Sequence, residues 1–181
     1  MSHIDSTPPP LVSEPGWTPL HPLPEVEAAR SFVSGEHQAR FRVAYFRRET
    51  DRHLMARAWF GPDAEGPPGH AHGGAVAAVL DEALGAVAWA EGHPIVVARL
   101  ITDFRQMVPL GTDATVDAWV HKVDGRKVYT HARLTDAAGT LLAEGQAICV
   151  RLNPGHLETF RKVRESRRRS AAPLWQAPTS G

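Results

Sequence analysis

The feature that most constrains this chain is the apolar run at residues 73–90, GGAVAAVLDEALGAVAWA. From Ala75 to Ala90 its only polar residues are Asp81 and Glu82. A surface helix would carry polar residues along one whole face, so this run predicts a helix that is buried nearly all round. Each of the two leading glycines destabilises a helix by about 0.5–1 kcal/mol relative to alanine, so the pair needs a structural or functional reason.

Alternation of apolar and polar residues predicts six strands around this helix. Two precede it, at about 40–46 and 54–60, with a turn near 49–52, and four follow it, at 95–107, 114–123, 127–135 and 141–152. The turns at 123–126 and 136–139 contain the Asp and Gly that tight turns favour. The resulting order, β-β-α-β-β-β-β, predicts an α+β fold in which an antiparallel sheet wraps around one long central helix.

The 181 residues, 43% of them hydrophobic, suit one globular domain. Residues 1–39 form a Pro-rich arm, because seven prolines before residue 25 oppose regular structure, with a possible short helix at 25–32. The domain itself is expected at 40–154. Residues 155–181 form a basic tail that we expect to be solvated and partly helical, the alternative being contact with an anionic ligand or partner.

Charge and composition bound the partners and the compartment. Lys plus Arg equals Asp plus Glu at 20 each, so the overall charge gives no reason to expect nucleic acid or an anionic membrane as a partner. The single cysteine, Cys149, cannot form an intramolecular disulfide, and the N-terminus lacks the basic and apolar segments of a secretory signal. With no segment judged long and apolar enough to span a bilayer, a cytoplasmic protein is expected.

The helix start and its acid together point to chemistry. A helix N-terminus carries unpaired N–H groups and partial positive charge, so it can hold an anion or a developing oxyanion, and glycines let a ligand approach. The alternative is that Gly73 and Gly74 only make a tight loop-to-helix turn. Asp81 lies on nearly the same helix face as Gly74. A carboxylate in apolar surroundings has a raised pKa, which suits a general base that works near neutral pH. The alternative is that Asp81 makes a structural hydrogen bond. Glu82 points elsewhere and is expected to be structural.

The spacing of these residues predicts a dimer. Gly74 and Asp81 lie about 10 Å apart along the helix axis. A water held by Asp81 could not reach a carbonyl bound at the start of the same helix. If both residues act in one reaction, they come from two antiparallel copies of the helix, in an obligate dimer with shared active sites.

Four segments together resemble the PaaI-like hot-dog fold acyl-CoA thioesterases, and within them the branch of thioesterase superfamily member 4. They are HAHGGAVAAVLDE at 70–82, ITDFRQMVPL at 101–110, VDGRK at 123–127 and VRLNP at 150–154. An HGG motif alone is weak, but its order with a helix acid, a Pro-ending strand and a Gly-Arg-Lys turn is specific. The resemblance spans roughly 40–154. It implies a hot-dog fold, hydrolysis of acyl-CoA to a free acid and CoA, no metal or organic cofactor, and a homodimer or dimer of dimers (homotetramer).

The resemblance also implies roles for individual residues. The backbone N–H of Gly73, with His72 beside it, would polarise the thioester carbonyl, and Asp81 would act as general base or as nucleophile. Contacts to the CoA substrate would fall on Gly74, Asp103, Arg105, Arg126 and Lys127. The three cations suit phosphates, whereas Asp103 suits the neutral pantetheine amide. A solvated sheet edge is the alternative for these charges.

One departure keeps other functions open. A family member has a threonine sixteen positions after the catalytic acid, where this chain has Val97. Three alternatives follow: another group orients the water here, the acid is the nucleophile, or hydrolysis is slow. A non-catalytic acyl-CoA binding or regulatory protein is therefore the alternative, and a hot-dog dehydratase is a third. A metal site of His70, His72 and Asp81 has no recognised spacing, and Cys149 lacks a nucleophile motif.

Overall fold

The computed structural model of the protein describes residues 10–21, 32–33 and 39–170, with side chains to residue 167. The chain divides into two compact units, residues 1–151 and residues 152–181, which are treated separately below. The first unit contains all the strands and the long helix. The described part of the second contains one helix, α2 (Pro154–Ser170).

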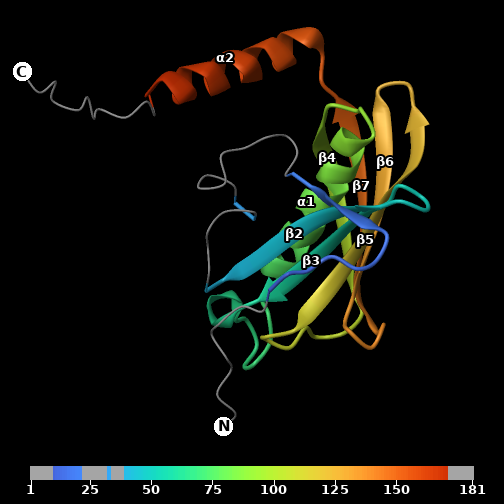
Figure 1. Ribbon diagram of the computed structural model, residues 1–181, viewed down its shortest axis with the longest axis vertical. Helices are drawn as coiled ribbons and strands as arrows, with labels where there is room; N and C mark the ends of the chain where they lie inside the picture. Colours follow the sequence, from blue (N-terminus) through green and yellow to red (C-terminus); the bar gives the residue numbers. More distant parts are fainter. Residues whose placement is uncertain (1–9, 22–31, 34–38, 171–181) are drawn as a thin grey trace, which may run out of the picture. The chain divides into compact units, whose positions relative to one another are not determined.

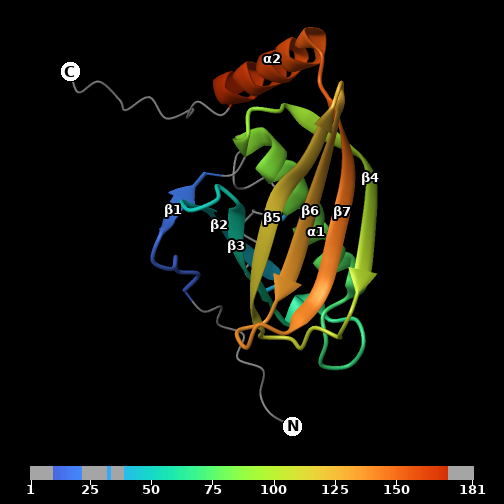
Figure 2. The same cartoon turned by 90° about the vertical axis from the view of Figure 1, so that its right-hand side faces the viewer.

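The first unit is a seven-stranded sheet with a long helix, α1 (Gly73–Ala90), packed against it (Figure 1). The strands lie in the order β1-β2-β3-β5-β6-β7-β4, and every neighbouring pair is antiparallel. Their bounds are β1 (Trp17–Leu20), β2 (Phe41–Arg48), β3 (Leu54–Phe60), β4 (Ile95–Phe104), β5 (Asp113–Asp124), β6 (Lys127–Thr135) and β7 (Leu141–Arg151). The sheet curves around α1, which contacts β3 to β7 (Figure 2). The α+β hot-dog fold expected from the sequence is confirmed.

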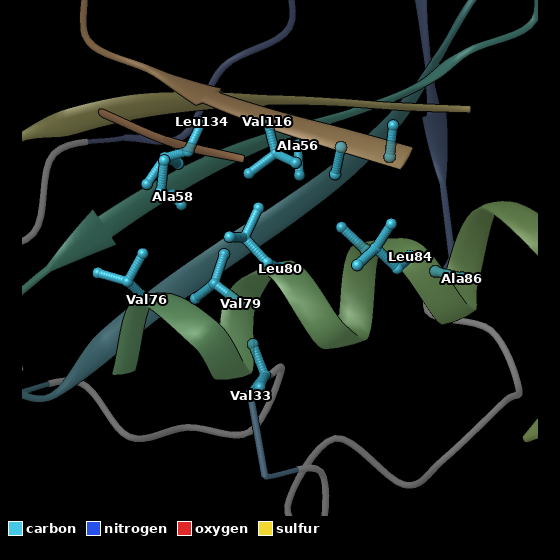
Figure 3. Close-up of a cluster of buried hydrophobic side chains, with 14 of the residues drawn as sticks. Val33, Ala56, Ala58, Val76, Val79, Leu80, Leu84, Ala86, Val116 and Leu134 are labelled. Atoms are coloured by element: carbon cyan, nitrogen blue, oxygen red, sulfur yellow. The ribbon is translucent and has the colours of Figure 1, made fainter. Parts of the chain in front are cut away.

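The core forms where the apolar side of α1 meets the inward side chains of the sheet (Figure 3). Val76, Leu80 and Leu84 are fully or almost fully buried there. Gly145 of β7 allows the close approach, because a Cβ at that position would lie 3.1 Å from the Leu84 Cδ1 atom. Val33, which is 3% exposed, lies on the side of α1 away from the sheet (Figure 3).

One stripe of α1 is not buried within the chain, which corrects the expectation of burial nearly all round. Gly74 is exposed, and Ala77, Ala78, Asp81 and Gly85 are only partly buried. Their spacing of three or four residues places them on one helix face. All but Asp81 are small, so this face could approach another surface closely.

Strand β1 was missed in the sequence, where the arm at residues 1–39 was expected to lack regular structure. Residues Trp17–Leu20 pair with β2, with Pro19 opposite Phe46. A proline cannot donate to a sheet ladder, but it is tolerated on an edge strand, and β1 is an edge strand. The short helix expected at 25–32 falls almost entirely outside the described residues.

The other predicted elements lie close to the observed ones. Strand β4 ends at Phe104 instead of residue 107. By length and composition, α1 is the one helix in the described part of the chain that could cross a membrane, contrary to the expectation that no segment would qualify. Its contacts with five strands are those of a core helix.

In the second unit, α2 starts with favourable local chemistry. Pro154 occupies its first position, and the Asn153 Oδ1 atom accepts a hydrogen bond from the His156 N–H at 2.8 Å. Along the helix, Arg161 forms ion pairs with Glu158 and Glu165. The helical part of the basic tail is thus partly neutralised by its own acids.

Candidate active site

The start of α1 is capped by a histidine side chain. His72 has extended backbone angles (φ −62°, ψ 136°), and its Nδ1 atom accepts a hydrogen bond from the Gly74 N–H at 2.9 Å. A neutral imidazole that accepts through Nδ1 carries its proton on Nε2, so His72 presents an N–H donor at the helix start. A Cβ at Gly74 would lie 3.0 Å from that Nδ1 atom, so glycine leaves room for the cap.

This cap leaves one amide of the glycine pair available. The Gly74 N–H, expected to contact substrate, is already bonded to His72. The Gly73 N–H has no partner within the described part of the chain. An unpaired N–H at a helix N-terminus can donate to an oxyanion or carbonyl, so the site has one free backbone donor, at the position expected for it.

The loop before α1 holds this geometry in place. The His72 N–H donates to the Ala64 carbonyl at 2.6 Å, and the Ala71 N–H donates to the Val108 carbonyl at 2.8 Å. Gly66 packs directly beneath His72, because a Cβ there would lie 2.7 Å from the His72 Cα atom. The donors at the helix start are therefore preorganised.

Phe104, the last residue of β4, lies beside the free amide. A Cβ at Gly73 would be 3.3 Å from the Phe104 Cζ atom. The Phe104 side chain is nevertheless 55% exposed. It therefore offers an apolar surface next to Gly73, where the acyl or pantetheine part of a thioester could pack.

Asp81 combines partial burial with the lack of a partner. It is half-buried on the open stripe of α1, and it has no hydrogen bond or ion pair within residues 10–21, 32–33 and 39–170. Burial raises the pKa of its carboxyl above the ordinary aspartate value. A structural hydrogen bond to the described residues does not explain Asp81, whereas a general base that accepts a proton fits its surroundings.

Glu82, the next residue, has the structural role that its position suggested. Its carboxylate accepts a hydrogen bond from the Tyr45 hydroxyl at 3.1 Å. The two adjacent acids thus have different environments, one bonded to β2 and the other on the open stripe.

The residues near Val97 supply no exposed hydroxyl in its place. Val97 is opposite Cys149 in the β4–β7 register, and the Cys149 Sγ atom lies 3.9 Å from the Thr130 Oγ1 atom. Burial raises the pKa of the Cys149 thiol, and the charge of Asp81 adds to this effect, so the thiol is a poor nucleophile. Thr102 faces the helix from β4 with its Oγ1 atom buried and unpaired.

One chain does not bring the expected CoA contacts together. Asp103 and Arg105 are at the Phe104 end of β4, where Arg105 forms an ion pair with Glu144 at 2.9 Å. Arg126 and Lys127 are at the opposite end of the sheet, since Lys127 is level with Val150 whereas Phe104 is level with Ala143. Seven strand residues separate these levels, or about 23 Å. The five residues therefore do not form a single site within one protomer.

The described surface has a hollow elsewhere. It has a volume of about 210 Å³ and is lined by Arg99, Ile101, Tyr129, His131, Gln146, Ala147 and Ile148. Most of these side chains alternate with core-facing neighbours such as Thr130 and Cys149, which places the hollow on the sheet face away from α1. It is therefore not part of the helix-start site. Among the described residues, no three His, Cys, Asp or Glu side chains group in a way that could hold a metal ion.

Sequence reasoning missed two residues near Arg126. Arg151, the last residue of β7, donates through Nη2 to the His93 Nδ1 atom at 3.0 Å, and Arg126 donates to the Arg151 carbonyl at 3.3 Å. Arg151 lay within the VRLNP segment that carried the resemblance, so the signal was present. That Arg151 lies beside His93 and Arg126 follows only from the pairing of β7 with β4 and β6.

The chain resembles known thioesterases in sequence. Residues 68–143 match the family described as "Thioesterase superfamily". Acyl-coenzyme A thioesterase THEM4 of Xenopus laevis is 32% identical over 115 residues, which are 63% of this chain and 52% of that protein. The chain thus spans about half the length of this curated relative.

Two solved structures show the same fold. One, a thioesterase superfamily protein, is 28% identical, with a TM-score of 0.55 over 60% of this chain and 53% of its own. The PaaI protein of E. coli, from the phenylacetic acid degradation operon, has a TM-score of 0.53 at 15% identity, over 56% of this chain and 73% of its own. The latter likeness concerns the fold alone.

Proposed function

We propose that the protein hydrolyses acyl-CoA thioesters to a free carboxylic acid and CoA, in keeping with the match of residues 68–143 to the thioesterase superfamily. The proposal rests on two groups of α1 that have no partner among the described residues: the Gly73 N–H at its start, and the half-buried Asp81, of raised pKa, on its open stripe. The similarity to THEM4, which is named as an acyl-coenzyme A thioesterase, supports the same chemistry.

The active unit is a two-fold dimer formed through α1 and β4. β4 is a ten-residue edge strand, and a long free edge is a template for pairing with another chain. Exposed apolar side chains lie along and just beyond it: Val96 is 46% exposed, Ile101 39% and Met107 65%. The free edge of β4 and the small residues of the open α1 stripe are therefore both suited to contact with a second copy.

A two-fold axis near Ala77 and Ala78 would complete the site. These residues are midway between Gly74 and Asp81, so antiparallel copies of α1 would place the helix start of one protomer beside the partner's Asp81. The same axis would set the Arg105 end of one β4 against the end of the partner sheet that carries Arg126 and Lys127. The two halves of the expected CoA site, which are about 23 Å apart in one chain, would then face each other.

In this arrangement the thioester carbonyl oxygen accepts hydrogen bonds from the Gly73 N–H and the His72 Nε2–H. Both donors are strongest when negative charge develops on that oxygen. The partner's Asp81 takes a proton from a water molecule as the water oxygen bonds to the carbonyl carbon. The tetrahedral intermediate then expels the CoA sulfur, which receives that proton from Asp81, and the acid and CoA leave. No metal ion or organic cofactor is needed for these steps.

The test is release of free thiol from a panel of short, medium, long-chain and aryl acyl-CoAs, with wild type and Asp81→Asn compared. We expect wild type to turn over at least one substrate and Asp81→Asn to lose that turnover while keeping its fold. Glu82→Gln is the matched control, because its carboxylate bonds to Tyr45 and should be dispensable for the chemistry. Turnover that persists in Asp81→Asn would exclude the proposed base.

The second candidate is a non-catalytic acyl-CoA binding protein, which Val97 favours because it lacks the hydroxyl found in a family member. It predicts that acyl-CoAs bind to folded wild type without release of thiol. Val97→Thr would then be expected to generate turnover.

A further inference from the structure

Three cations gather at the end of the sheet where α1 and β7 finish. Arg126 lies in the β5–β6 turn, Lys127 begins β6, and Arg151 ends β7 beside them. The Arg151 N–H donates to the Arg126 carbonyl at 2.8 Å, and the Arg126 side chain donates to the Arg151 carbonyl at 3.3 Å. The three residues therefore meet at one corner of the sheet, here called the Arg151 corner.

The charges of the Arg151 corner are not neutralised within the described residues. None of its three cations has an acidic partner there. The neighbouring acids are already engaged, since Glu91 lies 3.7 Å from both Arg47 and Arg52, and Asp124 lies 3.7 Å from Lys122.

Other arginines of the sheet form ion pairs with nearby acids. Arg48 pairs with Asp117 at 2.9 Å, and Arg57 pairs with Asp113 at 2.8 Å. Cations that are not neutralised at one corner of the sheet favour binding of an anion with several negative charges.

Arg151 is the member of the corner held most firmly. It is partly buried, and its Nη2 atom donates to the His93 Nδ1 atom at 3.0 Å. His93 lies in the turn between α1 and β4, so this bond ties the guanidinium to the end of the helix. A guanidinium that is fixed in advance loses less conformational freedom when it binds a phosphate bidentately.

We propose that Arg151, positioned by His93, binds the phosphates at the nucleotide end of CoA and makes the protein selective for CoA thioesters over thioesters of pantetheine alone. The inference rests on the proposed function. The corner is separated from Asp81 by the last nine residues of α1, about 14 Å, a gap that an extended pantetheine arm can bridge. The phosphates carry no part of the reacting bond, so Arg151 acts on affinity and not on the chemical step.

The experiment compares one acyl group carried by CoA and by pantetheine, using wild type, Arg151→Gln, His93→Ala and the control Arg42→Gln. Arg42 is exposed on β2, across the sheet from the corner. We expect Arg151→Gln to raise KM for the acyl-CoA about ten-fold, as for the loss of one charge-assisted contact, with kcat unchanged. The acyl-pantetheine kcat/KM should stay within two-fold of wild type, as a roughly neutral surface substitution allows. His93→Ala should give a smaller KM effect in the same direction.

A second arm measures binding of adenosine 3′,5′-bisphosphate by calorimetry, with inorganic phosphate as the comparison. Weaker binding of the bisphosphate to Arg151→Gln, restored in Arg151→Lys, supports the proposal. Equal loss with both thioesters, or no change with either, overturns it, as does equal affinity of wild type and Arg151→Gln for the bisphosphate. If wild type hydrolyses neither thioester, the proposed function fails, and the calorimetric arm still decides whether Arg151 binds the nucleotide.

Discussion

A mixed dimer tests whether the active site is shared between protomers. The mixed dimer contains one chain with Gly73→Val and one chain with Asp81→Asn. The Gly73 substitution fills the space over the free amide, since even a Cβ there lies 3.3 Å from Phe104. Valine has a higher helix propensity than glycine, so loss of activity would not come from a weakened helix.

The expected activity follows from the geometry. Gly73 and Asp81 are eight residues apart, or about 12 Å along the axis, which is far beyond hydrogen-bonding reach through one water. In a mixed dimer, one site would combine both defects and the other would combine an intact Gly73 with an intact partner Asp81. Equal amounts of the two chains give about half mixed dimers, each with one working site of two, so the mixture should show about one quarter of wild-type activity.

The assay is thiol release after co-expression of the two chains with different tags, with purification of the doubly tagged species. That species should have about half the wild-type kcat, while each single-variant dimer should be nearly inactive. If the doubly tagged dimer is no more active than the single-variant dimers, each site is built from one chain and the two-fold arrangement is wrong. Unfolding midpoints of both variants close to wild type exclude misfolding as the cause of inactivity.

Four further predictions concern individual side chains. Because burial raises the pKa of Asp81, the acid limb of the kcat/KM profile should have its midpoint above about 3.9, the ordinary aspartate value; a midpoint at that value would argue against Asp81 as the base. Because the pKa of Asp81 is raised in the folded state, the protein loses stability as pH rises through that pKa and the carboxyl ionises. Asp81→Asn should therefore be more resistant to urea than wild type at pH 7, and the two proteins should differ less in urea resistance at pH 3. His72→Ala should lower the free energy of unfolding by about 1 kcal/mol through loss of the cap, and His72→Asn should recover most of it; equal stability of all three would refute the capping role. Thr102→Val should raise the free energy of unfolding by about 1 kcal/mol, because it removes a buried unpaired hydroxyl; a decrease would indicate that the hydroxyl is bonded in the assembled protein.

Much of the fold was predictable because its elements have strong local signals. The run at 73–90 is apolar over five turns, and the turns at 124–126 and 136–139 carry residues with special backbone preferences, such as Gly125 with φ +56°. Strand β1 lacked such a signal: its proline argues against a strand in general, and only its position at the sheet edge makes the residue acceptable.

The candidate site was predictable in part, for a different reason. Asp81 and Gly73 lie on one helix, so their relation follows from helix geometry alone. The separation of Arg105 from Arg126 depends on β4 pairing with β7 at the edge of the sheet. That pairing joins segments distant in sequence, and nothing local in either segment encodes it.

The role of His72 shows what local geometry adds to a motif. The sequence placed His72 beside the glycines without saying what its ring does. The ring takes the Gly74 N–H, so each helix start keeps the Gly73 N–H as its free glycine amide and presents the His72 Nε2–H as an additional donor. Preorganised donors stabilise a developing oxyanion more than the neutral carbonyl. Loss of the His72 ring should therefore lower kcat more than it raises KM, whereas an Asn that only caps the helix should restore stability and leave kcat low.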